Sequence, residues 1–234
     1  MVLITAIASM VGTALAGKGD TRLISRQSAS AGGDGGDAGS SDPSVSRNGR
    51  FIAFATDADN LGGPANDVTN VYVYDTEKRK VRLVSRQSAS AGGEGQDQSS
   101  FPDPEISANG RFVTFLTDAD NLGGPAQDVT NVYVYDLEER KVRLVSRRSA
   151  SAGGGGADSG SGDPTLSGNG RFITFRTSAD NLGGPTQDVT NVYVYDREER
   201  KVRLVSRRSA SAGGEGADQN SSNPSISSSG RFVA

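Results

Sequence analysis

The sequence predicts an all-β fold built from repeated four-stranded antiparallel sheets, and three observations support this prediction. The segment ADNLGGPANDVTNVYVYD at 58–75 returns almost unchanged at 119–136 and 179–196. Prolines that open a short strand-like motif recur 61, 60 and 60 residues apart, at Pro43, Pro104, Pro164 and Pro224. No stretch shows the sustained apolar period of 3.6 residues that is typical of helices. A fixed repeat of about 60 residues indicates units that stack on one another.

The first unit contains four predicted strands. Residues 43–46 form the first strand, and the Asn-Gly pair at 48–49 supplies the positive-φ positions of a tight turn. The second strand, 50–56, and the third, 69–75, are rich in β-branched and aromatic residues, and a Gly-Gly-Pro loop separates them. The fourth strand, 80–85, follows a short polar turn. A connection rich in Ser and Gly then leads to the next unit.

The side-chain pattern predicts how these sheets pack. The second and third strands carry apolar residues on both faces, so each sheet needs a neighbouring sheet on either side. The fourth strand alternates Lys80 and Arg82 with Val81 and Leu83, which suits an outer edge because charged side chains there oppose edge-to-edge pairing. The tyrosines of the third strands are expected to fill the space between sheets. Together these features predict a β-propeller of four-stranded blades.

Four blades in a single domain, 1–234, are expected. Three are complete, at 42–86, 103–147 and 163–207. The last residues, 223–234, supply the first two strands of a fourth blade. Residues 1–26 are expected to supply its other two strands, because 21–33 match 81–93 at an offset of 60. Such a split blade closes the ring and removes its exposed edges.

Other interpretations of the termini stay open. Residues 1–16 are apolar and end in Ala14-Leu15-Ala16, which is a signal-like pattern, although no positive region precedes it. The segment is too short for a membrane span to be expected. The chain could also be a fragment of a larger ring, or a subunit that shares one. In that case, self-association through unpaired terminal strands is expected.

The repeated motifs resemble a known family. The segments PSVSRNGRFIAF (43–54), PEISANGRFVTF (104–115) and PTLSGNGRFITF (164–175), each followed by NVYVYD, are similar to the PD40 (TolB-type, WD40-like) propeller repeat. The resemblance implies a β-propeller that mediates interactions, in a secreted or periplasmic location. It does not imply one activity, because propellers carry many unrelated functions.

The composition excludes several classes of site. The chain has no His, Cys or Trp, which removes Ser-His-Asp and Cys-His catalysis, disulfides, and zinc sites that need imidazole or thiolate. Lys and Arg number 25 and Asp and Glu 28, so the net charge is −3. A charge this nearly balanced does not indicate a nucleic-acid partner.

Oxygen-bearing side chains recur in the loops between the second and third strands and are the candidate ligand or calcium residues. They are Asp57, Asp59, Asn60, Asp67, Asp118, Asp120, Asn121, Asp128, Asp180, Asn181 and Asp188. Clustered oxygens in a Gly-containing loop can bind Ca²⁺. The competing interpretation is that Asp and Asn bond to nearby backbone and fix the loops. A second motif, G-G-x-G-x-D, recurs at 32–37, 92–97, 153–158 and 213–218 and predicts a flexible inter-blade loop. No catalytic residue is assigned and no cofactor is expected.

These features predict a non-enzymatic scaffold that binds a protein or saccharide-like (glycan) ligand through repeated loops, with avidity from several equivalent sites. Near-identical blades repeat the same groups, whereas acid–base catalysis needs groups in distinct environments. One alternative is a hydrolase or lyase whose carboxylates line the propeller pocket. Another is a recently amplified or engineered repeat array without a ligand of its own.

Overall fold

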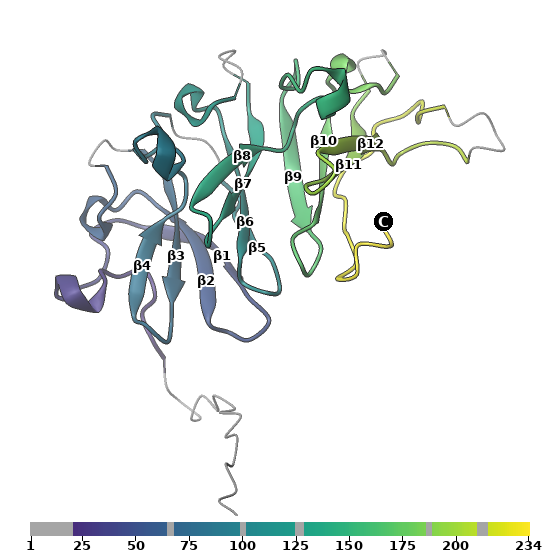
Figure 1. Cartoon of the computed structure of the whole chain (residues 1–234). Coiled ribbons are helices and arrows are strands. Elements are labelled where there is room, and N and C mark those ends of the chain that lie inside the picture. The colour runs from purple at the N-terminus through teal and green to yellow at the C-terminus, as the bar shows by residue number, and fades with distance from the viewer. Residues whose placement is uncertain (1–20, 65–67, 99–101, 125–128, 186–188, 210–214) are drawn as a thin grey trace, which may run out of the picture.

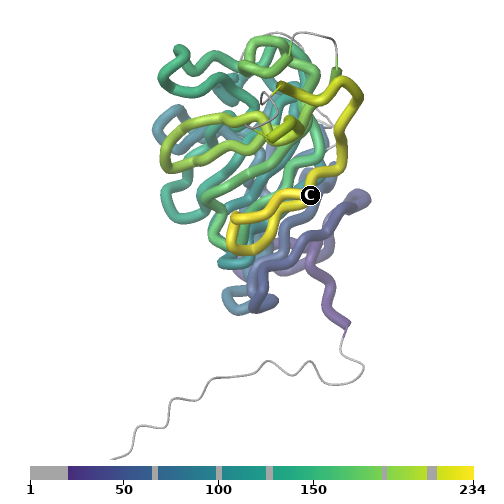
Figure 2. The backbone as a smooth tube through the Cα atoms, turned by 90° about the vertical axis from the view of Figure 1, so that its right-hand side faces the viewer, coloured from purple at the N-terminus to yellow at the C-terminus, as the bar shows by residue number. Residues whose placement is uncertain are grey.

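Three four-stranded antiparallel sheets stand side by side in a computed structural model of the chain (Figure 1). The structure describes residues 21–64, 68–98, 102–124, 129–185, 189–209 and 215–234. Figure 2, turned so that the right-hand side of Figure 1 faces the viewer, shows the successive sheets one behind another. The predicted blade architecture is therefore confirmed.

Within each sheet the strands follow one another in chain order. The first sheet comprises β1 (Ser40–Val45), β2 (Phe51–Thr56), β3 (Asn70–Asp75) and β4 (Lys80–Leu83). The second comprises β5 (Glu105–Ile106), β6 (Phe112–Thr117), β7 (Asn131–Asp136) and β8 (Lys141–Leu144). The third comprises β9 (Ser161–Leu166), β10 (Phe172–Thr177), β11 (Asn191–Asp196) and β12 (Lys201–Leu204). Short 3-10 turns connect them: η1 (Ala29–Ala31), η2 (Asp59–Leu61), η3 (Ala89–Ala91), η4 (Asp120–Leu122), η5 (Ala150–Ala152) and η6 (Asp180–Leu182).

The outer strands are shorter than predicted, because the ladder becomes irregular after Leu83. The backbone N–H groups of Val84 and Ser85 both donate to the carbonyl of Val71, at 2.8 and 3.3 Å. The Ser85 hydroxyl oxygen in turn accepts the N–H of Val71 at 2.9 Å. Two residues thus face one on the neighbouring strand, which is a bulge, and regular pairing ends there.

The core lies between the sheets, as the two-sided apolar strands predict. Every residue of β6 and β7 is buried. Within each sheet a tyrosine of the third strand stacks on a phenylalanine of the second; the pairs are Phe54–Tyr72, Phe115–Tyr133 and Phe175–Tyr193, with ring centroids 6.0, 5.9 and 5.8 Å apart. The tyrosines therefore serve packing, as expected.

A phenylalanine at the start of each second strand fits against a glycine of the next sheet. Phe112 is 2% exposed, and its ring occupies the space that a Cβ at Gly170 would need. Gly170 also has a φ of +69°, a conformation that glycine adopts without strain. Phe51 lies against Gly110 in the same way. The Asn-Gly turn is therefore both a tight turn and a contact point between sheets.

An ion pair joins the Asn-Gly-Arg turn to the end of the third strand in each sheet. Arg111 donates from Nη2 to Asp136 at 2.7 Å, and Asp136 is 1% exposed. The same carboxylate accepts the backbone N–H groups of Glu138 and Glu139 at 2.9 and 3.1 Å. Burial by itself raises the pKa of Asp136, but the Arg111 guanidinium and the two N–H groups lower it more, so the net pKa lies below its ordinary value. Equivalent ion pairs are Arg50–Asp75 and Arg171–Asp196.

The ring is not closed by the described residues. At the C-terminal end of the row, Ile226 and Val233 form a single bridge, which is the hairpin expected of a fourth blade. Residues 21–26 lie at the opposite end of the row, beside the first sheet, and Arg26 bridges to Gly35 (Figure 1). Residues 1–20 lie outside the described residues, so the split fourth blade and the signal-like segment stay predictions. No helix in the described ranges has the length and apolar character needed to cross a membrane.

Phe112→Ala is expected to lower the free energy of unfolding by about 3–5 kcal/mol, because it empties a buried contact between two sheets. Phe232 occupies the same repeat position but is 68% exposed, so Phe232→Ala should change stability by less than about 0.5 kcal/mol. Urea unfolding of both variants measures the difference. Equal losses would show that the inter-sheet contact does not support the fold.

Asp136→Asn is expected to destabilise the protein by about 1.5–3 kcal/mol at pH 7, where the ionised carboxylate holds Arg111. Because the pKa of Asp136 is lower when folded than when unfolded, this stabilisation is present above about pH 4 and is lost as pH falls through the folded pKa. Unfolding curves of wild type and variant from pH 7 to pH 2.5 should therefore converge in acid. A difference that does not change with pH would contradict this account.

Candidate functional site

The loops that were expected to be flexible are held against the following sheet. In three equivalent contacts an Asn amide of the DNL turn donates to a carbonyl of the preceding G-G-x-G loop, at 2.9 Å each: Asn60 to Gly35, Asn121 to Gly95 and Asn181 to Gly156. The backbone N–H of Asp59 donates to the Asp37 carboxylate at 3.0 Å, and that of Asp180 to Asp158 at 3.0 Å. The two oxygen-rich motifs therefore bind each other and join neighbouring repeats.

The other candidate residues fall in different places. Asp57 accepts the hydroxyl of Thr69 at 2.5 Å. Asp118 lines a pocket that is described below. Three candidates lie outside the described residues: Asp67, Asp128 and Asp188. Within the part of the chain that the structure describes, no group of three acidic side chains could hold a metal ion.

The innermost strands of the three sheets lie next to one another and form the inner side of the row. β5 packs against β1, and β9 packs against β5. A pocket of about 850 Å³ opens there, which we call the inner pocket. Its lining is Asp42, Asp103, Leu116, Asp118, Thr130, Ser159, Gly160, Ser161, Gly162, Asp163, Arg176 and Ser178. Most of these side chains are polar, so the pocket suits a polar ligand.

The inner strands repeat an unusual backbone conformation. Asp42, Asp103 and Asp163 each precede a proline and have φ values of 49°, 33° and 49°. Asn223, at the same repeat position, has a φ of 51°. Positive φ is uncommon for residues other than glycine and costs about 1–3 kcal/mol where the surrounding structure imposes it. Three arginines in the turns before the outer strands, Arg79, Arg140 and Arg200, have similar φ values, so the conformation is a feature of the repeat.

The carboxylates of the inner pocket are electrostatically coupled. Partial burial raises the pKa of Asp103, and the charges of Asp42 and Asp163 raise it further. Glu105 on β5 is not a lining residue, but burial also raises its pKa; an N–H from Leu166 opposes this shift and the charge of Asp103 reinforces it. These groups take up protons more readily than ordinary carboxylates, chiefly because burial disfavours the charged form and secondarily because a negative charge lies nearby.

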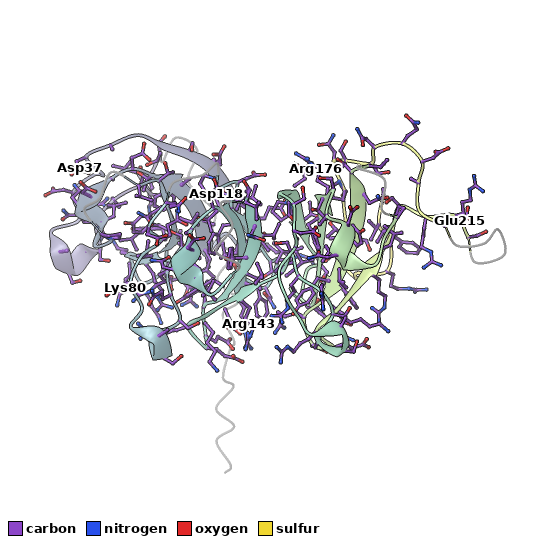
Figure 3. All side chains as sticks on the ribbon, turned by 90° about the horizontal axis from the view of Figure 1, so that it is seen from above. Asp37, Lys80, Asp118, Arg143, Arg176 and Glu215 are labelled. Carbon is purple, nitrogen blue, oxygen red and sulfur yellow. The ribbon has the colours of Figure 1, made fainter. Side chains whose placement is uncertain are left out.

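One positive charge faces these carboxylates. Arg176 donates from Nε to Asp163 at 2.5 Å. Figure 3 labels Arg176 and Asp118 on the same side of the molecule, from the third and second sheets, respectively. Asp163 is therefore paired with a positive charge, whereas the two charges that raise the pKa of Asp103 are both negative. The pocket thus offers both hydrogen-bond donors and acceptors, and carboxylates in two different environments.

Two polar atoms of the inner pocket have no hydrogen-bond partner among the described residues. Ser161 is 5% exposed, and its hydroxyl oxygen is one of them. The other is Oδ1 of Asp118. Buried polar atoms in folded proteins are nearly always paired with protein, water or a ligand. Both atoms therefore need a partner other than the described protein atoms, such as water or a polar ligand.

Sequence reasoning named Asp118 but missed most of this pocket. It named the prolines that follow Asp42, Asp103 and Asp163 but did not name these carboxylates as candidates. In the sequence, the site can be recognised by the positions at which one repeat has a different residue from the others. Among the lining residues, Arg176 stands where the other sheets have Ala55 and Leu116. The pocket is therefore less symmetric than the repeat itself.

Comparisons with known proteins show no family for this chain. No family model matches the chain, and no curated protein matches it. Among solved structures, it is similar to TolB from Acinetobacter baumannii, with 14% identity and a TM-score of 0.48 over 84% of this chain and 37% of that one.

It is also similar to the putative TolB from Agrobacterium tumefaciens, with 15% identity and a TM-score of 0.43 over 71% of this chain and 48% of that one. An oligogalacturonate lyase in complex with manganese is also similar, with 11% identity and a TM-score of 0.43 over 70% of this chain and 40% of that one. The chain spans less than half the length of each of these proteins. The propeller architecture rests on the three sheets themselves, and the likenesses assign no activity.

Asp103→Asn is expected to stabilise the fold by about 0.5 kcal/mol at pH 7, a small amount because solvent screens the charges. Since the pKa of Asp103 is raised on folding, its ionisation disfavours the folded state above that pKa, and the gain should vanish as pH falls below about 4. Asparagine suits this backbone, because Asn223 occupies the same repeat position with a similar φ. Thermal unfolding at pH 7 and pH 3.5 measures the effect, with Asp34→Asn, an exposed carboxylate, as the control. A loss of stability at pH 7 would contradict the proposed repulsion.

Proposed function

We propose that this chain is a non-enzymatic propeller scaffold that binds a saccharide-like ligand in the inner pocket, in a secreted or periplasmic location. The observation that supports this proposal most strongly is the unpaired, buried hydroxyl of Ser161 in a pocket of about 850 Å³. A pocket of this size lies in the range that small ligands occupy.

The chemistry of the lining favours a polyhydroxylated ligand over an apolar one. The carboxylates of Asp42, Asp103 and Asp163 accept hydrogen bonds from hydroxyl groups, and Arg176 donates to ring or hydroxyl oxygens. The lining has a single large apolar residue, Leu116, and no aromatic residue. A segment of a protein partner would be expected to need more apolar surface at the centre of its contact.

A hydrolase or lyase is the second proposal, and one observation favours it. Asp103 has a raised pKa, whereas its neighbour Asp163 is paired with Arg176. Carboxylates whose environments differ in this way can divide the roles of acid and base. The Asp103 carboxyl would then act as a proton donor, and the Asp163 carboxylate as a base or charge stabiliser.

A saccharide-binding experiment tests the first proposal. The purified chain is applied to an array of neutral, amino and acidic oligosaccharides, and each positive ligand is titrated by calorimetry. Saturable binding is expected, and Asp163→Asn and Arg176→Leu should each weaken it by about ten-fold or more, because each loses a hydrogen bond to a charged group. The fold should accept both replacements, because Asn223 occupies the repeat position of Asp163 and Leu116 occupies that of Arg176.

The control is Arg22→Leu, which removes an exposed positive charge and should leave binding unchanged. Absence of binding to any saccharide, or full binding by the two pocket variants, would overturn the proposal. The same mixtures are analysed for cleaved products. Cleavage that disappears in Asp103→Asn would establish the hydrolase or lyase and rule out a non-enzymatic scaffold.

A further inference from the structure

A second pocket lies on the opposite side of the molecule from the inner pocket and has the opposite electrostatic character. It has a volume of about 610 Å³ and is lined by β8, the turns η3 and η4, and the third sheet. Figure 3 labels Arg143 on this side, away from Asp118 and Arg176. We call it the outer pocket. Its lining is Gln87, Ser88, Ser90, Ala91, Asn121, Leu122, Gly123, Val142, Arg143, Leu144, Arg147, Tyr195, Arg197 and Arg200.

Four arginines line the outer pocket, and no Asp or Glu is among its lining residues. Arg143 is paired with Glu139 at 2.8 Å. Among the described residues, no carboxylate oxygen comes within 4.0 Å of Arg147, Arg197 or Arg200. Nε of Arg147 is buried without a hydrogen-bond partner in the described part of the chain. The positive charge of this pocket is therefore only partly neutralised by the protein.

Arg197 is the most constrained of these side chains. Its Nε donates to the carbonyl of Gly170 at 3.2 Å, and its guanidinium lies 4.0 Å from the ring centroid of Phe112. Burial lowers the pKa of Arg197, and the charges of Arg143 and Arg111 lower it further against the opposing charge of Asp136. An arginine stays protonated under these conditions. A fixed, partly desolvated guanidinium is well suited to bind an oxyanion.

The outer pocket is not simply repeated between the first and second sheets. At the repeat position of Arg197 the second sheet has Leu137, and the first sheet has Thr76. Leu137 packs against the apolar core instead of adding a charge. The equivalent position between the first two sheets keeps Arg82, Arg86 and Arg140, so Arg197 is the additional charge that distinguishes the outer pocket.

We propose that the outer pocket binds a phosphate or sulfate group, with Arg143, Arg147, Arg197 and Arg200 as its charged donors. Guanidinium groups bind such oxyanions through paired, charge-assisted hydrogen bonds. Ser88, Ser90 and Asn121 also line the pocket, where the Ser88 hydroxyl is bound to Val142 and the Asn121 amide to Gly95. This site is independent of the saccharide pocket, because the two share no lining residue.

Titration calorimetry with two probes tests the site and distinguishes the source of the oxyanion. Inorganic pyrophosphate represents a small phosphate, and a heparin-derived hexasaccharide represents a sulfated saccharide. At constant ionic strength, at least one probe should bind the whole chain with a dissociation constant below about 1 mM. Arg197→Leu is expected to weaken this binding about ten-fold, which corresponds to ~1.4 kcal/mol.

Leucine suits the turn at this position, as Leu137 shows, but Arg197→Leu also removes the contact with Phe112. Arg200→Gln is therefore a second variant, because Arg200 is exposed and its replacement should leave the fold intact. It should likewise weaken the probe about ten-fold. Arg22→Leu controls for the loss of an exposed positive charge and should not change the affinity. If neither probe binds, or if both pocket variants bind as tightly as Arg22→Leu, the site is refuted.

Discussion

The fold depends on apolar strands that are covered only when sheets stack. Both faces of β6 and β7 are buried, and a single four-stranded sheet has no second layer of its own with which to bury them. The contact of Phe112 with Gly170 shows how closely neighbouring sheets approach. Because every sheet presents the same surfaces, each unit is stabilised chiefly by the next, as in other repeat proteins.

Polar contacts fix the distance and direction of this stacking. Hydroxyl oxygens of the inter-sheet loops accept backbone N–H groups of the next outer strand, Ser88 from Val142 at 3.1 Å and Ser149 from Val202 at 3.0 Å. The amide of Asn121 also holds this loop, because it donates to the carbonyl of Gly95. The inner strands also lie beside one another, β5 against β1 and β9 against β5. That placement explains why a strained backbone and clustered carboxylates are tolerated around Asp103, since the stacked sheets hold them there.

Function in this chain is proposed to arise where the repeats differ. Arg176 pairs with Asp163 in the inner pocket, whereas Arg197 contributes positive charge to the outer pocket. Both arginines belong to the third repeat, and residues of the second and third repeats line both pockets, with Asp42 of the first sheet added in the inner pocket. Identical packing residues preserve the architecture, so single substitutions at pocket positions can change ligand chemistry without disturbing the fold.

The sequence by itself determined the strands, the turns and the stacking of the sheets, because these follow from local patterns: a period of two, Asn-Gly turns, and apolar residues on both faces. It also identified Asp118 and the loop Asn residues, but not their roles. Only the tertiary structure decided that Asn60 and its equivalents join repeats, and that Asp42, Asp103 and Asp163 meet at one pocket. The physical reason is distance along the chain. These carboxylates are about 60 residues apart, and their interaction depends on how whole sheets pack, which no local pattern specifies.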